Sequence, residues 1–258
     1  AQKLCIPVAH VEAGIRSGDW TMPEEINRIV TDSITNYFFT TTAAAGQLLL
    51  ANGVKPSQIF FVGNTMIDTL IRQMPHFQPP PFWQAFSLQP QKYLVLTLHR
   101  PSNVDNEAQL RSLFEVSERA SCSLPVVRPA HRRAAKNMAQ FGIALHNVKV
   151  VEPMGYLEFN YLVQHAKGVI TDSGGITEET TVMQVPCMTI RENTERPETC
   201  TIGTNELLGS SPAALENAMN RLLNNQWKKG GIPPLWDGQA AARIVAALLQ
   251  LKLASNAI

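Results

Sequence analysis

The sequence has few cysteines, no long apolar run and almost no net charge. None of its four cysteines forms a CxxC pair, and none is clustered with histidines at zinc-site spacing; they are Cys5, Cys122, Cys187 and Cys200. This usage favours free, buried thiols in a reducing cytoplasm. No apolar run approaches the roughly 20 residues that a membrane span needs. We therefore expect a cytoplasmic protein without a metal centre.

The charge balance argues against binding to nucleic acid or to a membrane surface. The formal net charge is +1, so there is no broad basic surface for either partner. Of the 258 residues, 45% are hydrophobic and 17% are charged, as in an ordinary globular protein of one large or two small domains. The first ten residues contain one charge and a short apolar run, which indicates a strand rather than a signal peptide.

Short apolar runs alternate with helical patterns along the whole chain, which predicts βαβ units and parallel sheets. The expected strands are 4–11, 37–41, 59–62, 93–98, 124–128, 148–151, 168–171 and 186–190. The expected helices are one that begins after Thr21, and 43–52, 105–120, 131–140, 156–166, 175–183, 212–224 and 238–253, with Gly53 ending the second of these. The sequence thus predicts the α/β class.

Residues 74–91 contain five prolines and predict a linker between two domains, because proline continues neither a helix nor a central strand. We expect a partial N-terminal Rossmann-like domain at 1–73 and a second Rossmann-like domain at 92–237. A C-terminal helix, 238–258, is expected to pack back on the first domain. The first domain has only about three strands, too few for a complete Rossmann-type half. The sequence therefore begins at what looks like a middle strand.

Two acidic residues near the N-terminus are candidates for acid and base catalysis. Glu12 lies in His10-Val-Glu-Ala-Gly-Ile-Arg16, directly after an apolar run, and Glu24 lies in Met22-Pro-Glu-Glu-Ile-Asn-Arg28. An α/β enzyme places such residues at the carboxyl ends of its strands. Glu24 has a second interpretation, because Thr21 looks like an N-cap and Glu24 would complete its capping box.

The helix after Thr21 is expected to bury an apolar face made of Ile26, Ile29, Val30 and Ile34. Glu25 would be solvated or paired with Arg28. His10 would either orient the strand end or pack in the core.

The segment Thr171-Asp-Ser-Gly-Gly-Ile-Thr-Glu-Glu179 is the main candidate for binding phosphate. An apolar strand ends, a glycine-rich loop follows, and a helix begins, so backbone N–H groups and the helix dipole would favour an anion. Ser173 can donate its hydroxyl, Gly174 and Gly175 allow close approach, and Glu179 could accept hydrogen bonds from a ribose. An ordinary tight turn is the alternative.

Three further basic residues follow predicted strands. Arg196, in Arg191-Glu-Asn-Thr-Glu-Arg-Pro-Glu198, could pair with a diphosphate, although a solvated loop is the alternative. His99, next to Arg100, could protonate or stabilise a leaving group, or could be structural. His131 adds positive potential, and a capping role for it is favoured over catalysis.

Taken together, these segments resemble the non-hydrolysing UDP-N-acetylglucosamine 2-epimerase family. The matching pieces are His10-Val-Glu-Ala-Gly-Ile-Arg-Ser, Met22-Pro-Glu-Glu-Ile-Asn-Arg, Val62-Gly-Asn-Thr-Met-Ile-Asp, Leu96-Thr-Leu-His-Arg, Asp172-Ser-Gly-Gly-Ile-Thr-Glu-Glu and Thr194-Glu-Arg-Pro-Glu. Each piece is weak evidence alone, but their occurrence in this order along the chain is specific for the family. The resemblance implies two Rossmann-like domains of GT-B type, the first one incomplete here.

The resemblance also implies roles for the candidate residues. Ser173, Gly174, Gly175 and Glu179 would hold the uridine diphosphate, with Arg196 near the phosphates and His131 on the same side. His99 would serve the diphosphate leaving group, and Glu12 and Glu24 would lie near the C1–C2 edge of the sugar. No metal or redox cofactor is implied, and a homodimer that binds a UDP-sugar is expected.

The chemistry that the resemblance implies is epimerisation at C2. The family eliminates UDP to form a 2-acetamidoglucal, returns a proton to C2 from the opposite face and adds UDP again, which makes UDP-N-acetylmannosamine for cell-surface polysaccharides. Family chains carry more sequence at the N-terminus, including a catalytic aspartate. From this we expect the 258-residue chain alone to be weakly active or inactive.

Several alternatives remain open at the level of sequence. A hydrolysing 2-epimerase, which releases N-acetylmannosamine and UDP, shares nearly all of these motifs. A GT-B glycosyltransferase would bind the same nucleotide, but the Glu12 and Glu24 arrangement argues against it. If the protein is not an enzyme, it is interpreted as a truncated UDP-binding remnant or as a regulatory module. A UDP-2,3-diacetamido uronic acid is an alternative substrate.

Overall fold

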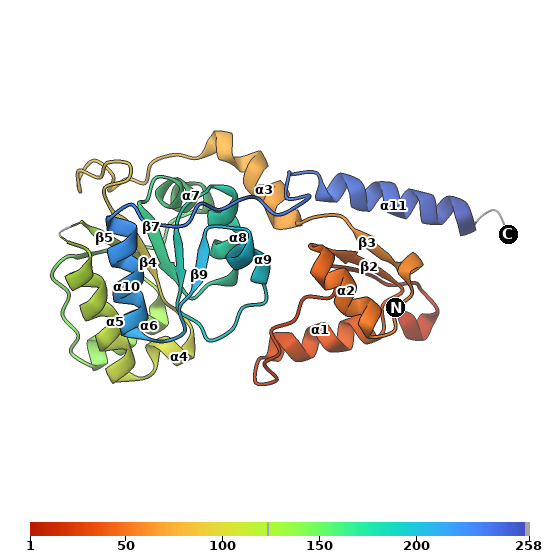
Figure 1. The fold of residues 1–258 in the computed structure, drawn as a ribbon, viewed down its shortest axis with the longest axis horizontal. Coiled ribbons are helices and arrows are strands. Elements are labelled where there is room, and N and C mark those ends of the chain that lie inside the picture. Colours follow the sequence, from red (N-terminus) through yellow and green to blue (C-terminus); the bar gives the residue numbers. More distant parts are fainter. Residues whose placement is uncertain (123, 256–258) are drawn as a thin grey trace. The chain divides into compact units, whose positions relative to one another are not determined.

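In the computed structural model, which describes residues 1–122 and 124–255, the strands form two separate parallel sheets (Figure 1). For Arg132 and residues 252–255 only the backbone is described. The chain divides into two compact units: Ala1–Arg72 joins the chain from Pro233 onward, and Gln73–Ile232 forms the other. The predicted α/β class with parallel sheets is confirmed.

The first unit contains a three-stranded sheet in the order β1-β2-β3. Its strands are β1 (Ala9–Val11), β2 (Tyr37–Thr40) and β3 (Ile59–Phe61), and its helices are α1 (Pro23–Ser33), α2 (Ala43–Ala51), α3 (Thr65–Gln73, ending at the unit boundary) and α11 (Ala240–Ser255). Short 3-10 turns occupy Gln2–Leu4 and Pro56–Gln58. The predicted strand at 4–11 is therefore shorter than expected, and the sequence reading missed α3.

The ends of α2 follow from local side-chain chemistry. The Thr42 hydroxyl accepts a hydrogen bond from the Ala45 N–H at 3.2 Å, which satisfies a donor that the first turn leaves free. After the helix, Gly53 has a φ of +84°, a conformation that glycine adopts without strain. This confirms the predicted helix end at Gly53.

The start of α1 differs from the prediction. The N-cap is Met22, which provides no side-chain cap, and the Thr21 hydroxyl instead donates to the Asp19 carboxylate at 2.6 Å. The capping box of Thr21 and Glu24 is therefore wrong, because the helix begins at Pro23, which places Thr21 one residue before the N-cap. Glu24 is exposed in the first helical turn.

The predicted buried face of α1 is also wrong. The side chains of Ile26, Val30 and Ile34 are exposed, with 44%, 55% and 50% of their surface accessible. The helix instead buries Glu25 and Asp32. These carboxylates are stable inside because they accept backbone N–H groups from the loop before the helix, as described below.

The chain returns to the first unit before α11. Trp236 is 2% exposed, and its indole N–H donates to the Thr41 carbonyl at 3.2 Å. The Asp68 carboxylate in α3 accepts the first N–H groups of α11, from Ala240 at 3.0 Å and Ala241 at 2.7 Å. This segment and helix therefore pack with residues 1–72.

The second unit contains a six-stranded parallel sheet in the order β6-β5-β4-β7-β8-β9. Its strands are β4 (Leu94–Thr97), β5 (Val126–Pro129), β6 (Val148–Val151), β7 (Gly168–Thr171), β8 (Cys187–Thr189) and β9 (Asn205–Leu207). The order reverses between β4 and β7, as in a dinucleotide-binding Rossmann fold. The sequence reading missed β9, because Asn-Glu-Leu has no apolar run.

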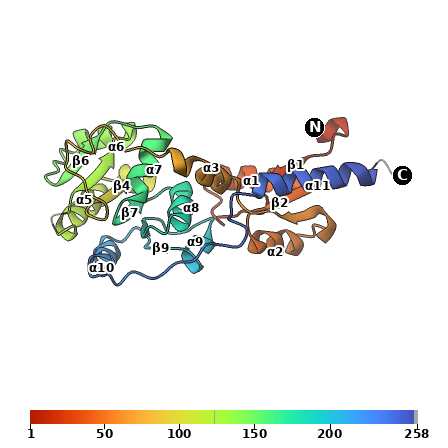
Figure 2. The ribbon, with the colours of Figure 1, turned by 90° about the horizontal axis from the view of Figure 1, so that it is seen from above.

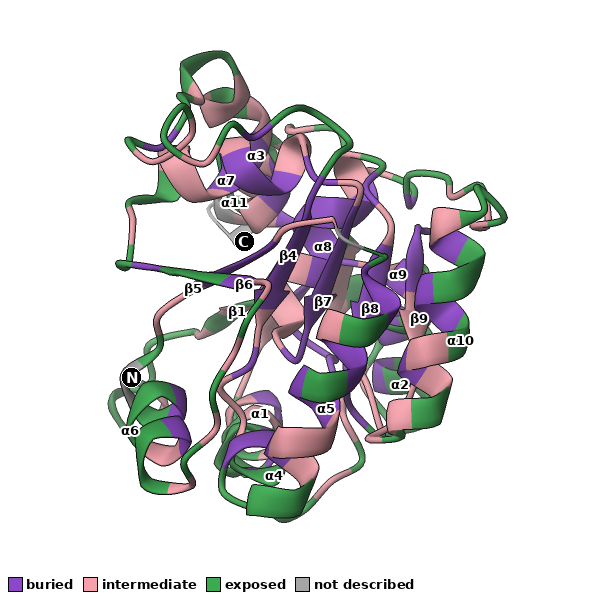
Figure 3. Ribbon diagram, turned by 90° about the vertical axis from the view of Figure 1, so that its left-hand side faces the viewer, coloured by how far each residue is buried: buried purple, intermediate pink, exposed green. Residues whose placement is uncertain are grey.

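Helices cover both faces of this sheet (Figures 2 and 3). They are α4 (Pro101–Val104), α5 (Glu107–Ala120), α6 (Arg132–Gln140), α7 (Tyr156–Gln164), α8 (Gly174–Val182), α9 (Pro197–Thr201) and α10 (Pro212–Leu223). Successive residues of β4 point to opposite faces, so Leu94 and Leu96 join one core cluster while Val95 joins the other. The central strands are buried on both sides.

The proline-rich stretch at 74–91 begins with a 3-10 turn at Met74–His76 and packs on the second unit through its aromatic residues. Leu88 is 5% exposed in the second core cluster, with Phe82, Trp83 and Phe86 packed against it. The Trp83 ring lies edge-on to Tyr161, with centroids 5.2 Å apart. Hydrophobic anchoring thus fixes a segment that has little regular structure.

Candidate functional site

The candidate site in the second unit lies where β4 and β7 end. Thr97 and Thr171 are register partners, and their hydroxyl oxygens are 2.7 Å apart. The loop after β4 carries His99 and Arg100, and the loop after β7 carries Asp172 and Ser173. Open parallel sheets bind ligands at this reversal of strand order, so both predicted loops stand at the expected place for a ligand.

The loop after β7 leads directly into α8. Ser173 is the N-cap residue of α8, its side chain makes no capping hydrogen bond, and its N–H donates to the Thr171 hydroxyl at 3.0 Å. The first turn of the helix has no acidic side chain. The N–H groups and positive dipole end of α8 can therefore receive an anion.

Asp172 is a buried carboxylate that connects the two loops. It accepts hydrogen bonds from the backbone N–H of His99 at 3.0 Å and of Arg100 at 2.9 Å, and from the Asn103 side chain at 3.1 Å. Its Oδ1 lies 2.7 Å from Nδ1 of His99. Burial acts to raise the pKa of Asp172, but His99, Arg100 and Asn103 together hold it below its ordinary value. The carboxylate is therefore ionised at neutral pH.

His131 lies beside His99. Their ring centroids are 5.6 Å apart with the planes tilted by 47°. His131 stands at the N-cap position of α6, but its side chain caps nothing there. Two imidazoles thus share the edge of the sheet at which α8 begins.

Arg196 belongs to a buried ionic cluster rather than to a solvated loop. Its Nε is 2.7 Å from the Glu178 carboxylate, and it is 9% exposed. Next to it, the Arg191 guanidinium donates to both oxygens of Glu195 at 3.0 Å. Burial opposes the ionisation of Glu195, but Arg191 and Arg196 lower the pKa of Glu195 to about 2.

This ionic cluster lies against the glycine-rich loop. A Cβ atom on Gly174 would be 3.5 Å from Nη1 of Arg196 and 3.7 Å from the Glu195 carboxylate. Glu178, which holds Arg196, is itself in α8. The structure therefore brings Arg196 together with Ser173 and Gly174, and the acidic partners offset much of its charge.

Glu179 is held at the same helix by a tyrosine. It is 6% exposed and accepts a hydrogen bond from the Tyr156 hydroxyl at 2.9 Å. Burial raises the pKa of Glu179, while Tyr156 and Asn160 act in the opposite direction. A carboxylate fixed in this way can accept a hydrogen bond from a ligand hydroxyl.

Glu12 and Glu24 belong to the first unit. Glu12 directly follows β1 and has a φ of +66°, which is unfavourable for a residue with a side chain. Strained positions of this kind occur at functional sites, where the surrounding structure fixes them. Glu24 is exposed and free of the predicted capping bond.

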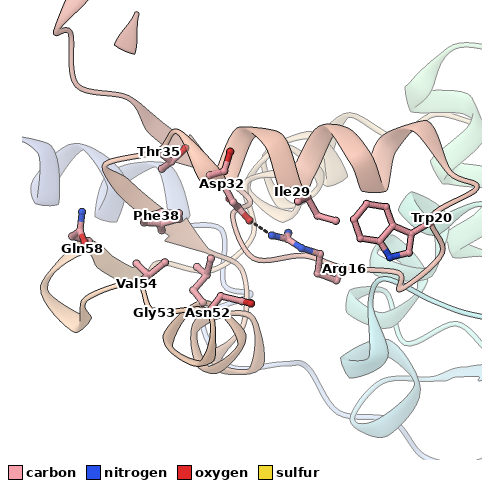
Figure 4. A pocket seen from close by; sticks show the side chains of 12 residues that line it. Arg16, Trp20, Ile29, Asp32, Thr35, Phe38, Asn52, Gly53, Val54 and Gln58 are labelled. Atoms are coloured by element: carbon pink, nitrogen blue, oxygen red, sulfur yellow. Dashed lines mark hydrogen bonds and ion pairs between the residues drawn. The ribbon is translucent and has the colours of Figure 1, made fainter. Parts of the chain in front are cut away.

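Two buried carboxylates of α1 fix the loop that follows Glu12. Asp32 accepts from the Gly14 N–H at 3.2 Å and from Arg16 at 2.6 Å, and its other oxygen lies 2.6 Å from Nδ1 of His10. His10 thus pairs at the strand end rather than packing in an apolar core. Figure 4 shows Arg16 and Asp32 facing each other in a pocket of about 570 Å³.

Glu25 ties the same loop further along. Its carboxylate accepts from the backbone N–H groups of Ser17 at 2.8 Å and Gly18 at 3.0 Å. Arg28 lies 3.8 Å away. The expected pairing of Glu25 with Arg28 is present, whereas the alternative prediction, that Glu25 is solvated, is wrong.

The sequence reading missed Asp172, Asn103 and the acidic partners Glu178 and Glu195. Only Asp172 carried a usable signal, because it comes directly after a buried strand and before the glycines. Glu195 pairs with Arg191 within its own loop, and nothing local indicates that it is buried, whereas Asn103 and Glu178 act through contacts between different elements. Tyr156 was missed for the same reason.

The remaining sequence predictions concern metals, membranes and thiols. Within the described residues, no three His, Cys, Asp or Glu side chains are grouped to hold a metal ion, and no described helix has the length and apolar character of a membrane span. All four cysteines are free, as predicted, but Cys5 and Cys122 are exposed, so burial is wrong for these two.

The six-stranded parallel sheet and its glycine-rich loop define the class: an α/β protein with Rossmann-like sheets, as in GT-B-type sugar-nucleotide enzymes. The profile of the UDP-N-acetylglucosamine 2-epimerase family matches residues 1–249. The chain belongs to this family, and the family consists of isomerases.

Individual relatives agree with this assignment. The chain is 39% identical to UDP-N-acetylglucosamine 2-epimerase of Methanocaldococcus jannaschii, over 96% of this chain and 70% of that protein. It is 35% identical to UDP-2,3-diacetamido-2,3-dideoxy-D-glucuronate 2-epimerase of Pseudomonas aeruginosa, over 97% of this chain and 70% of that protein.

Solved structures give the same picture. The M. jannaschii enzyme in complex with UDP-GlcNAc and UDP superposes with a TM-score of 0.83, at 39% identity, over 97% of this chain and 71% of that one. The Neisseria meningitidis UDP-GlcNAc 2-epimerase bound to UDP-GlcNAc superposes with a TM-score of 0.84, at 29% identity, over 96% of this chain and 71% of that one.

Proposed function

We propose that this protein converts UDP-N-acetylglucosamine to UDP-N-acetylmannosamine by eliminating UDP and adding it back. Membership of the 2-epimerase family supports this assignment. The observation that carries it is the pairing of His99 with the Ser173 loop at the reversal of the sheet, where an imidazole and a helix N-terminus can both receive a diphosphate.

The second unit would bind the UDP. The N–H groups at the start of α8 and the Ser173 hydroxyl would hold phosphate oxygens, and Gly174 and Gly175 would let them approach. Glu179 would accept from the ribose. Arg196 would act mainly by fixing the loop, since Glu178 and Glu195 already engage it. His131 would add positive potential beside His99 when it is protonated.

Glu12 and Glu24 would handle protons at C2. No carbonyl is adjacent to the C2–H bond, so removal of this proton is feasible only as the C1–O bond to UDP breaks. One carboxylate would take the proton while His99 stabilises the departing diphosphate, and this leaves a 2-acetamidoglucal and UDP. The second carboxylate would then give a proton to C2 from the opposite face, and UDP would re-form the bond to C1.

Solvent exchange tests this proposal directly. The protein is incubated with UDP-N-acetylglucosamine in D₂O, and deuterium at C2 is measured by NMR. We expect weak exchange with the 258-residue chain, and Glu12→Gln and Glu24→Gln should each slow it further, by on the order of 10²-fold. Glu115→Gln, an exposed change in α5, is the matched control and should leave the rate unchanged.

The products separate the alternatives. Accumulation of free N-acetylmannosamine and UDP would indicate a hydrolysing 2-epimerase. UDP binding in calorimetry with no deuterium at C2 would contradict the epimerase proposal and favour a UDP-binding protein with little activity. Deuterium at C2 of a UDP-2,3-diacetamido uronic acid, and not of UDP-N-acetylglucosamine, would indicate the kind of substrate for which the P. aeruginosa relative is named.

We also propose that the protein is a homodimer, that it acts in the cytoplasm, and that its product is a precursor of cell-surface polysaccharide. Sedimentation of the purified protein tests the dimer, and a monomer at the concentrations used for the assay would contradict it.

A further inference from the structure

We propose that Asp172 is a positioning residue for His99, and that its carboxylate sets both the orientation and the tautomer of the imidazole. This inference rests on the proposed function, in which His99 serves the departing UDP. Asp172 itself would touch neither sugar nor phosphate. It would act only by fixing the orientation and the tautomer of the His99 imidazole.

The contact between the two side chains determines which nitrogen carries the proton. Oδ1 of Asp172 is 2.7 Å from Nδ1 of His99. An ionised carboxylate can only accept hydrogen bonds, so Nδ1 must donate. Nε2, on the far side of the ring, is then left for the ligand: it accepts in the neutral ring and donates in the protonated one.

The same carboxylate also holds the main chain that carries the ring. It accepts the N–H groups of His99 and Arg100 at 3.0 and 2.9 Å. Asp172 in turn donates its own N–H to the Thr97 carbonyl at 3.3 Å. Ring and backbone of His99 are therefore fixed by one residue at the end of the neighbouring strand.

Burial makes this arrangement rigid. Asp172 is fully buried, so water does not compete for its oxygens, whereas the His99 side chain keeps 38% of its surface exposed. A catalytic group needs such a supporting partner, because a small error in its placement costs rate. A half-exposed imidazole without this partner would sample several rotamers.

The competing explanation is that Asp172 merely ties two loops together. Its bonds to backbone N–H groups and to Asn103 would do this without any use of the His99 ring. The two explanations differ in whether the effect of Asp172 passes through the imidazole.

Nitrogen NMR of the ligand-free protein tests the tautomer without any assay of activity. With ¹⁵N-labelled histidine, the wild type should show His99 protonated at Nδ1, and Asp172→Asn should give a mixture of both tautomers. Asn103→Ala removes a donor from the Asp172 carboxylate but leaves the ring contact, so it should keep the wild-type tautomer. A wild-type ring protonated at Nε2 alone would overturn the proposal, even if Asp172→Asn failed to fold.

A double-mutant cycle then asks whether Asp172 acts through His99. Asp172→Asn should lower kcat by about 10²-fold, with a much smaller change in KM. In a His99→Gln background the same substitution should cause almost no further loss. Equal losses in both backgrounds would overturn the positioning role.

The two proposals fail in different ways. If the 258-residue chain incorporates no deuterium at C2, the epimerase function is wrong for this chain, while the NMR signature still decides the role of Asp172. If the wild type is active and the His99 tautomer does not respond to Asp172→Asn, the positioning role alone is overturned.

Discussion

At the scale of single residues, Arg128 in β5 is the most unusual side chain of the second unit. It is 1% exposed, and its Nε and Nη2 have no hydrogen-bond partner among the described residues. The guanidinium lies 5.3 Å from the centre of the Phe114 ring. Burial lowers the pKa of Arg128 to about 10, so it remains charged at neutral pH. A cation–π contact offsets only part of the cost of burying this charge.

Arg128→Met should therefore stabilise the protein. Methionine fills a similar volume without a charge, and we expect the free energy of unfolding to rise by about 1–3 kcal/mol in urea denaturation. The matched control is Arg119→Met, because Arg119 is paired with Glu216 at the surface; it should change stability by less than about 0.5 kcal/mol. A loss of stability in Arg128→Met would mean that the guanidinium has a favourable role in the fold.

The sequence predicted single site residues unevenly. Ser173, Gly174 and His99 follow apolar strands, and the structure places them directly after the neighbouring strands β7 and β4, as that pattern implies. Glu25 was predicted to be solvated or paired with Arg28, and no prediction was made for Asp32. They are buried because the preceding loop presents N–H groups to them, and this depends on tertiary contacts that no local pattern encodes.

At the scale of elements, the close approach of two segments fixes the chain before α11. Gly63 has a φ of +93°, and a Cβ atom there would stand 2.1 Å from the Leu235 carbonyl oxygen. Because the atom in the way is backbone, the turn from Pro233 to Trp236 would have to move. The loss would reach Trp236, which is buried next to it.

Gly63→Ala should thus destabilise the first unit strongly, by more than the roughly 1–2 kcal/mol expected from the left-handed backbone alone. Gly53→Ala is the control, since Gly53 has a φ of +84° with no atom within 4 Å of a Cβ, so only the backbone term applies. Urea unfolding of both variants measures the difference. Equal losses would contradict a role for the contact with Leu235.

Elements were predictable where apolar runs were long enough. The strands β4 and β7 are buried on both faces and read as continuous apolar runs, so they were found. The short β9 and the five-residue α9 have no such run, and β9 forms as a strand because it pairs with β8. The predicted start of α1 is one residue too early, because the N-cap is Met22 and not Thr21.

At the scale of the whole molecule, the two units differ in how they are built. The second is one continuous stretch with two large core clusters, one on each face of its sheet. The first joins two distant stretches, and its core cluster among the described residues comprises Ala13, Phe38 and Leu49, with Val54 and Ile59 packed against it. Their independent stabilities should therefore differ.

We expect residues 73–232, expressed alone, to fold with a cooperative thermal transition and to bind UDP. Residues 1–72 without the chain from Pro233 should not fold cooperatively, because Trp236 and the contacts of α11 would be absent. Circular dichroism melts and calorimetry with UDP measure both fragments. A non-cooperative melt of 73–232 would contradict the independence of the second unit.

The order of strands in the second sheet has a consequence for how the protein folds. β4 pairs with β5 nearby in sequence, but its other neighbour, β7, is joined to it through contacts 74 residues apart, such as that between Thr97 and Thr171. Closing so long a loop is slow, so the half that contains β4 to β6 can form before the other half docks. His99 contacts Asp172 only once β4 and β7 are paired. The pair would therefore appear late in refolding, and its NMR signal would mark the moment at which the sheet is complete.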